Sequence, residues 1–308
     1  MSAQRCNTPI CSIAVLAAAI VALALFGCSN SGNDEATGAD FTPAQTVAES
    51  TYDAAAASGD SGVSIDSSHA SDGYIGIAAT ASSRLKALLS NGQSTYSYDV
   101  PQDGTPIICP LNMGDGSYLV RVMQNTSGSN YVELYRTTVD VSLSSEFAPY
   151  LHPNVYCSYD ANSECTAQAR DLVADCENQG QALKAICTWI VDNVSYDNDK
   201  AQQLKDASGY VPNPDSTLQS KTGICFDYAS LGAAMLRSQG IPTQIVTGYV
   251  SPQNIYHAWI MVYIDGTWTS AQFSVEANTW SRVDLTFAAN SDNENVGDGR
   301  EYSDRYVY

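Results

Sequence analysis

Residues 222–229 read Thr-Gly-Ile-Cys-Phe-Asp-Tyr-Ala and open a run in which apolar residues recur at helical spacing, namely Leu231, Ala234, Met235 and Leu236. This pattern predicts a helix that begins near Cys225 and stops before Gly240 and Pro242. A thiol at a helix N-terminus lies at the positive end of the helix dipole, which favours the thiolate. Gly223 permits a tight turn that lets the thiol reach a cleft. The stretch therefore predicts a nucleophilic cysteine, the alternative being a packed core residue.

A catalytic thiolate needs an imidazole that protonates the leaving group, and the chain has only three histidines. His69 and His152 lie in segments without a predicted regular element. His257 lies in the second of two predicted strands, 243–250 and 255–264. We therefore expect His257 to meet Cys225 across one helix and one strand.

A third side chain should orient the imidazole. If Asp265-Gly266 forms a two-residue hairpin turn, His257 faces Ser274 on the next strand. Gln272 and Glu276 then become its diagonal neighbours on the same face, within side-chain reach. This register assumes the shortest turn. Asp227 is interpreted as a charge in the first turn of the helix rather than as a catalytic group.

Several motifs in this order resemble the core of the transglutaminase-like superfamily. Residues 181–196 resemble its opening helix, 223–250 its nucleophile helix and following strand, and 257–268, with His-Ala-Trp and Gly-Thr-Trp, its histidine strand and hairpin. The resemblance implies a papain-like α+β fold, with the nucleophile helix packed on an antiparallel sheet, and a Cys–His–Asp triad. It makes Cys225 the nucleophile and His257 the general acid and base.

The third triad position departs from that family. Four residues after Trp268, where the family usually has Asp followed by Pro, this chain has Gln272 and Phe273. An amide oxygen still accepts a hydrogen bond from an imidazole, so Gln272 is the predicted orienting residue and Glu276 the fallback. No cofactor or metal is expected. The acidic run 292–299 lacks an oxygen ligand at Val296, where a calcium loop of the EF-hand type requires one.

The N-terminal segment has the features of an exported lipoprotein. Arg5 precedes the apolar run 13–26, which at 14 residues is shorter than a membrane-spanning helix. The run ends in Leu-Phe-Gly-Cys, which resembles the lipobox of a bacterial lipoprotein, with Cys28 as the lipidated residue. Residues 1–27 are therefore predicted to be a signal peptide, and the mature protein to be extracytoplasmic and held on the cell membrane through Cys28.

Three further segments follow. Residues 28–72 hold eight acidic residues and no Lys or Arg, and few large apolar residues, which predicts a disordered acidic tether. Turn signals such as Asn91-Gly92, Asp103-Gly104 and Ser127-Gly128 recur through 73–150 and predict a small all-β, sandwich-like domain. The transglutaminase-like domain is expected to occupy 151–308.

The charge balance excludes one class of function. With 14 Lys and Arg against 33 Asp and Glu, the net charge of −19 argues against a nucleic-acid partner. The expected function is a thiol enzyme that acts on peptide or carboxamide bonds of a protein or peptide substrate through a Cys225 thioester. Water as acceptor gives a peptidase or amide hydrolase, and an amine gives a cross-linking acyltransferase. The alternative is a catalytically weak or inactive transglutaminase-like binding module on the cell surface.

Overall fold

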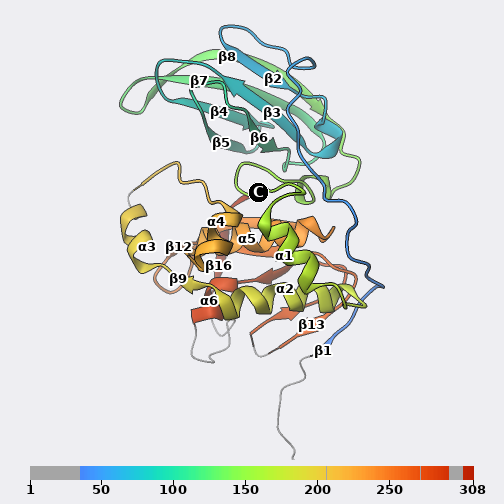
Figure 1. The fold of residues 1–308 in the computed structure, drawn as a ribbon. Coiled ribbons are helices and arrows are strands. Elements are labelled where there is room, and N and C mark those ends of the chain that lie inside the picture. The colour runs from blue at the N-terminus through green and yellow to red at the C-terminus, as the bar shows by residue number, and fades with distance from the viewer. Residues whose placement is uncertain (1–34, 206, 271, 291–300) are drawn as a thin grey trace, which may run out of the picture. The chain divides into compact units, whose positions relative to one another are not determined.

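The structure is a computed structural model that describes residues 35–205, 207–270, 272–290 and 301–308. The fold is α+β, as predicted. Strands dominate up to residue 141, and the described α-helices all follow it, from α1 (Glu164–Leu172) to α6 (Leu285–Asn290) (Figure 1). Two short 3₁₀ helices, η1 (Ala70–Asp72) and η2 (Ala148–Tyr150), complete the first part.

The β-rich part contains two antiparallel sheets. One has the order β2-β3-β6, from Val63–Asp66, Tyr74–Ala79 and Ile107–Pro110. The other has the order β5-β4-β7-β8, from Thr95–Val100, Leu85–Ser90, Gly116–Ser127 and Asn130–Val141. Buried and exposed residues alternate along β5, so one face of its sheet covers the core. The turns at Asn91-Gly92 and Ser127-Gly128 connect β4 to β5 and β7 to β8, as predicted, and both glycines have positive φ.

The prediction of a disordered tether does not hold for residues 35–72. Strand β2 pairs with β3, and its Val63 and Ile65 are buried in the core. Further upstream, β1 (Glu35–Ala36) pairs with β13 (Trp268–Thr269) in the C-terminal half of the chain. Short strands that complete an existing sheet need few apolar residues because backbone hydrogen bonds supply the pairing, so low average hydropathy did not indicate them. Residues 28–34 lie outside the described residues.

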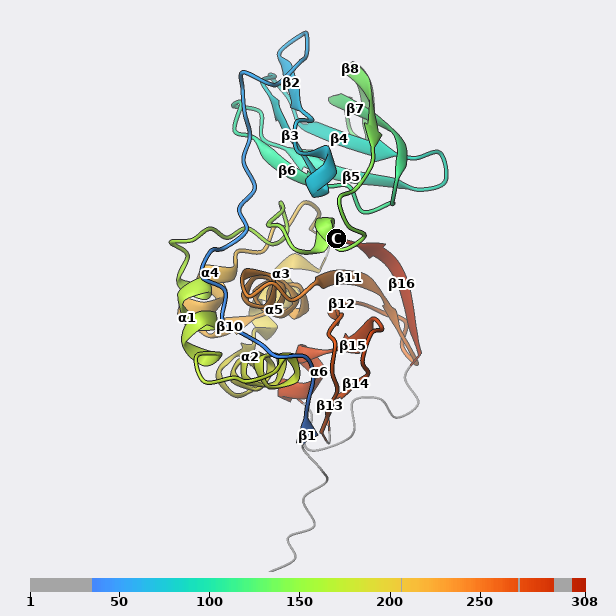
Figure 2. The same cartoon turned by 90° about the vertical axis from the view of Figure 1, so that its right-hand side faces the viewer.

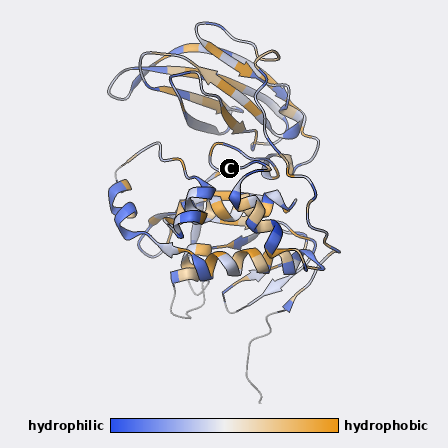
Figure 3. Ribbon diagram, viewed as in Figure 1, coloured by the Kyte–Doolittle hydropathy of each residue, from blue (hydrophilic) through white to orange (hydrophobic). Residues whose placement is uncertain are grey.

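The helical part is built around α5 (Cys225–Ser238), in which every residue from Asp227 to Ser238 is buried. The predicted opening helix is α2 (Gln179–Asn193), and its apolar residues Leu183, Ile186 and Ile190 are buried. Two short helices, α3 (Asn198–Leu204) and α4 (Pro214–Ser220), lie between α2 and α5 in the chain. Figure 3 shows α5 as largely hydrophobic and α3 as largely hydrophilic.

The main sheet of this part has the antiparallel order β15-β12-β11-β16. Its strands are Ser281–Val283, Ile255–Val262, Thr243–Val250 and Tyr302–Val307. Helix α5 packs on β11 and β12, and α1, α2 and α5 lie on one side of the sheet (Figure 2). This is the predicted packing of a nucleophile helix on an antiparallel sheet. A parallel pair, β9 (Ser195–Tyr196) and β10 (Thr222–Gly223), leads into α5.

The predicted hairpin at Asp265-Gly266 is wrong. Strand β12 pairs with β15, with Val262 opposite Ser281, whereas β13 pairs with β14 (Ser274–Val275) and β1. Residues 265–267 instead accept hydrogen bonds from the N-terminal segment at Thr37 and Ala39. A Cβ atom on Gly266 would lie 2.1 Å from the carbonyl oxygen of Thr37, so this glycine serves close backbone contact rather than a hairpin turn.

The helices of the described residues are too short or too polar to cross a membrane.

Candidate active site

Cys225 is the first residue of α5, as predicted, and its side chain is partly exposed. The turn before it requires Gly223, because a Cβ atom there would lie 2.6 Å from the Cβ of Asp227. The first amides of a helix have no partner within the helix, so the N–H of Cys225 is available close to the thiol. Local sequence thus places a thiol and a hydrogen-bond donor side by side.

The described cysteines are all free thiols, and Cys225 differs from the others in its surroundings. Cys109, Cys165 and Cys187 are fully buried, and burial raises the pKa of each well above its ordinary value. Burial also raises the pKa of Cys157 to about 11, and raises that of the half-buried Cys176. Neutral thiols are poor nucleophiles, so these five residues are suited to packing.

His257 lies on β12 and is 5% exposed. Its Nε2 lies 2.8 Å from Oδ2 of Asp284, and the thiol of Cys225 is a second group that interacts with the ring and raises its pKa. With Nε2 occupied by the carboxylate, Nδ1 is the ring nitrogen left for the thiol. The structure therefore brings together the predicted cysteine and histidine.

The protonation of His257 follows from these neighbours. Burial lowers its pKa, but the hydrogen bonds and charges of Asp284 and Cys225 outweigh burial and raise the pKa to about 10. The ring is therefore protonated at neutral pH, as a thiolate–imidazolium pair requires.

The orienting residue is Asp284, and the prediction of Gln272 with Glu276 as fallback is wrong. Nε2 of Gln272 donates to the carbonyl oxygen of Ala288, and Glu276 is exposed. The error follows from the register, since β15 and not β13 lies beside β12. Asp284 directly follows β15 and precedes α6. It therefore lies at the end of a strand and also at the capping position of the helix that follows. In the sequence, the signal that could have located Asp284 was an Asp between a stretch of alternating hydrophobicity and a stretch with helical periodicity.

The carboxylate of Asp284 is held by three donors. Besides His257, the hydroxyl of Tyr302 donates to Oδ2 at 2.9 Å, and the N–H of Phe287 donates to Oδ1 at 3.0 Å. The ring of Phe287 also stacks on that of His257 at a centroid distance of 4.5 Å. These contacts fix both the carboxylate and the plane of the imidazole.

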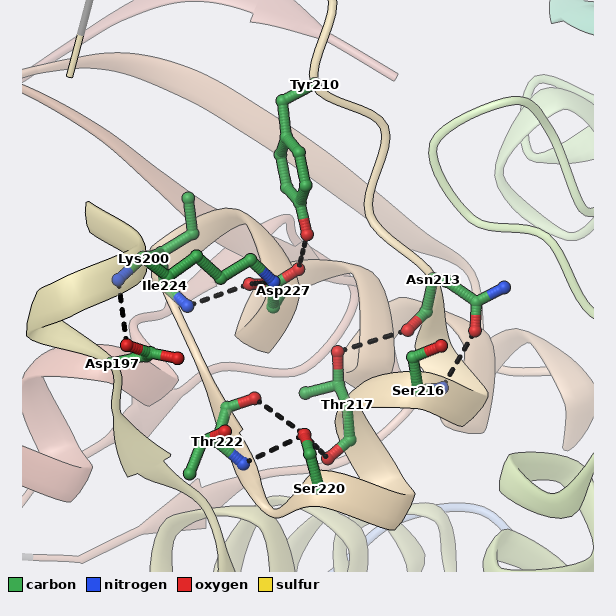
Figure 4. Close-up of polar contacts among 10 residues, drawn as sticks. All are labelled: Asp197, Lys200, Tyr210, Asn213, Ser216, Thr217, Ser220, Thr222, Ile224 and Asp227. Atoms are coloured by element: carbon green, nitrogen blue, oxygen red, sulfur yellow. Dashed lines mark hydrogen bonds and ion pairs between the residues drawn. The ribbon is translucent and has the colours of Figure 1, made fainter. Parts of the chain in front are cut away.

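A second buried carboxylate, Asp227, lies two residues after Cys225 and contacts Ile224, Lys200 and Tyr210 (Figure 4). Its Oδ2 accepts hydrogen bonds from the ammonium of Lys200 at 2.7 Å and from the N–H of Ile224 at 2.8 Å. Its Oδ1 accepts a hydrogen bond from the hydroxyl of Tyr210 at 2.5 Å. Asp227 is thus more than the simple first-turn charge that the sequence predicted.

A polar cavity of about 370 Å³ adjoins this carboxylate. It is lined by Lys200, Tyr210, Asp227 and Thr222, and by hydroxyl and amide side chains of α4 and its N-terminal cap (Figure 4). Thr222 and Asp227 lie within three residues of Cys225, so the cavity borders the nucleophile turn.

Among the described residues, no group of three or more His, Cys, Asp or Glu side chains has the arrangement of a metal site. The acidic run 292–299 lies outside the described residues. The expectation that the protein needs no cofactor or metal stays a prediction.

Known proteins that resemble this chain include relatives of limited coverage. A UPF0252 protein of Methanocaldococcus jannaschii is 28% identical over 183 residues, which are 55% of this chain and 44% of the archaeal protein. The kyphoscoliosis peptidase of Homo sapiens is 27% identical over 138 residues, or 41% of this chain and 20% of the human protein. The matches thus span less than half the length of either relative.

Among solved structures, red sea bream transglutaminase is 14% identical with a TM-score of 0.28, covering 72% of this chain and 49% of that chain. The family model described as the transglutaminase-like superfamily matches residues 166–284. This range contains Cys225 and His257 and ends at Asp284, which here completes the Cys–His–Asp arrangement. Residues 166–284 therefore form a domain of the transglutaminase-like superfamily.

Proposed function

We propose that the protein is a thiol enzyme that cleaves peptide or carboxamide bonds through an acyl-thioester on Cys225. The observation that carries this proposal is the 2.8 Å contact between His257 and Asp284, with Cys225 as the second partner of the same ring. The imidazole is thereby oriented toward the thiol and kept protonated, which is the resting state of a cysteine nucleophile.

In the first half of the reaction, the Cys225 thiolate attacks the substrate carbonyl carbon and forms a carbon–sulfur bond. The carbonyl oxygen becomes an oxyanion, which the N–H of Cys225 at the start of α5 can stabilise. His257 then gives its proton to the departing nitrogen, the carbon–nitrogen bond breaks and an amine leaves. Asp284 stays ionised and stabilises the imidazolium until that proton is transferred.

In the second half, the neutral His257 removes a proton from water or from an acceptor amine, which attacks the thioester. The carbon–sulfur bond breaks, the thiolate returns and the imidazolium is restored. Water releases a carboxylic acid, whereas an amine yields a new amide. The residues of the site support the acyl-enzyme and are compatible with either acceptor.

The alternative of an inactive binding module depended on Gln272 in the third triad position. Because Asp284 supplies an ionised partner for His257, that reason for expecting lost chemistry no longer applies. Enzymatic function is therefore the better-supported of the two.

The first test measures alkylation of the full chain by iodoacetamide at neutral pH, with modified residues identified by mass spectrometry. We expect Cys225 to react far faster than Cys176 and the buried thiols, and Cys225→Ala to lose the fast phase. A Cys225 that reacts no faster than a free thiol in a peptide contradicts the proposal.

The second test separates the two outcomes of the reaction. Peptide substrates with carboxamide side chains are incubated with and without a primary amine, and products are identified by mass. Release of ammonia or cleaved peptide in water indicates hydrolysis, and incorporation of the amine indicates transfer. Cys225→Ala should abolish both.

We also propose that the mature chain is extracytoplasmic and anchored through a lipid on Cys28. This rests on the charged start, the 14-residue apolar run and the Leu-Phe-Gly-Cys sequence that ends it. Metabolic labelling with a fatty-acid analogue in a bacterial host should mark the wild type and leave Cys28→Ala unlabelled. Labelling of both to the same extent contradicts the anchor.

A further inference from the structure

The nucleophile turn has a polar support that the acyl-transfer steps do not use. Asp227, two residues after Cys225, has no exposed surface, yet its carboxylate accepts three hydrogen bonds (Figure 4). One of the three donors is the N–H of Ile224, the residue directly before the nucleophile. The carboxylate therefore fixes the first turn of α5 at the point where the thiol is attached.

The other two donors come from a different part of the chain. Lys200 lies on α3, and Tyr210 lies on the segment between α3 and α4. Helix α3 contributes no buried residue, so it is not held in place by apolar packing of its own. Lys200 also lies over the ring of Tyr210, with its ammonium 4.8 Å from the ring centre. These side chains therefore form one unit that converges on Asp227.

We infer that Lys200 and Tyr210 are positioning residues for Cys225, and that they act through Asp227. By holding the carboxylate, they fix the peptide between Ile224 and Cys225, and with it the direction of the thiol and of the neighbouring N–H. The inference rests on the proposed function, because it concerns the same nucleophile. Lys200 and Tyr210 form none of the hydrogen bonds described above for His257 and Asp284, yet the inference gives both residues a role in the reaction.

Charge is the second part of the argument. Among the described residues, His257 on β12, backed by Asp284, and Tyr196 on β9 are close enough to Cys225 to interact with its charge, and Asp227 belongs to its own helix. An uncompensated Asp227 carboxylate would oppose a thiolate two residues away. The ammonium of Lys200 neutralises that carboxylate at 2.7 Å, so its loss should make the thiolate harder to form.

Lys200 is suited to substitution because its side chain is 30% exposed, whereas that of Asp227 is 1% exposed. Both Lys200 and Tyr210 also line the cavity of about 370 Å³. Changes in these two residues therefore alter the support from its accessible side without removing a core group.

The experiment measures the rate of Cys225 alkylation by iodoacetamide between pH 4 and pH 9 in the full chain. For Lys200→Met we expect the rate at low pH to fall about threefold, as for an upward shift of about half a pH unit in thiolate formation. Lys200→Arg keeps the charge and should restore the wild-type profile. Tyr210→Phe should slow the reaction about twofold through loss of one hydrogen bond.

Two matched controls lie in the β-rich part. Lys86→Met removes an ion pair of 2.8 Å with Asp99, in which the lysine side chain is 33% exposed. Tyr52→Phe removes a hydroxyl contact of 2.8 Å with Ser64. Neither should change the alkylation profile. Thermal unfolding of each variant separates a general loss of stability from a local effect on the thiol.

The two possible failures give different results. If wild-type Cys225 reacts fast and Lys200→Met and Tyr210→Phe follow the same pH profile, the inference is overturned and the proposed function stands. The inference is also overturned, and the proposed function stands, if the variants unfold at lower temperature without any change in the alkylation profile. If wild-type Cys225 itself reacts like a free peptide thiol, the proposed function fails, and the positioning role fails with it.

Discussion

Two buried carboxylates flank Cys225 and are bound by matching sets of donors. Asp284 accepts from the imidazole of His257, the hydroxyl of Tyr302 and one backbone N–H. Asp227 accepts from the ammonium of Lys200, the hydroxyl of Tyr210 and one backbone N–H. The sets differ in the cation: on one side it is an imidazolium that can pass a proton to a reacting group, and on the other it is an ammonium that acts as a point charge.

This difference separates two tasks that both need a carboxylate. In the proposed mechanism the cation on the side of Asp284 takes part in proton transfer; its side chain is only 6% exposed and stacks on Phe287. On the side of Asp227 the cation is a fixed charge at a partly exposed surface. We therefore propose that one carboxylate serves proton transfer and that the other serves the geometry of the nucleophile turn.

The largest effect is expected from Asp284→Asn. The amide cannot stabilise the imidazolium, so turnover of a peptide substrate should fall about a hundredfold or more. Asp215→Asn is the control, because Asp215 accepts two backbone N–H groups at the start of α1 and contacts neither Cys225 nor His257 in the hydrogen bonds described. Equal turnover in Asp284→Asn and the wild type would contradict the assignment.

Asp227→Asn tests the other carboxylate, and its main effect should be on stability. The substitution leaves the ammonium of Lys200 without its ionised partner, and the free energy of unfolding should fall by about 2 kcal/mol. Urea denaturation measures this loss. Turnover should fall less than in Asp284→Asn. A larger loss of turnover in Asp227→Asn than in Asp284→Asn would contradict the roles assigned to the two carboxylates.

The pH dependence of stability should report His257. Its folded pKa of about 10 exceeds the unfolded value of 6.5, so its contribution is fully present below pH 6.5 and is lost as the pH rises toward 10. The free energy of unfolding should therefore decrease between pH 6.5 and 9. His257→Gln should flatten this slope, and an unchanged slope would show that other groups cause it.

The two tyrosines allow a smaller, paired test. Tyr302→Phe and Tyr210→Phe each remove one hydroxyl donor from a buried carboxylate, and each should lower the free energy of unfolding by about 1 kcal/mol. Only Tyr302→Phe should lower the pH at which the stability contribution of His257 disappears. Identical pH profiles for the two variants would weaken the distinction between the carboxylates.

The smallest effect is expected from Gln272→Ala. Its amide donates to Ala288 and does not contact His257, so turnover should stay within about twofold of the wild type, as for an ordinary hydrogen bond outside the site. A large loss of turnover with unchanged stability would return Gln272 to the catalytic site.

The sequence predicted those parts of the site that depend on local pattern. Cys225 was located by a helix start and a glycine, and His257 by its place in a strand. The helix α5 and strands β11 and β12 follow from apolar periodicity and from Gly240 and Pro242, which lie between them.

Local pattern marks Asp284 only as an Asp between a strand and a helix; that it meets His257 depends on which strand pairs with β12. Strand β15 lies beside β12, while Gly266 is in close backbone contact with the segment at Thr37, more than 200 residues away in the chain. The pairing of β1 with β13 is equally distant in the chain, which is one reason why the predicted tether is wrong. Neither pairing is encoded in local hydropathy.

The pairing of β1 with β13 has a consequence for the proposed lipid anchor. If Cys28 carries the lipid, it is only seven residue steps from Glu35, where the chain joins the sheet that contains β13. A fully extended chain of that length spans about 25 Å. A tether to residue 72 would have allowed about 150 Å at the same rise per residue. The active site would then be confined to a thin layer beside the membrane, and its substrates would be bonds that come within that layer.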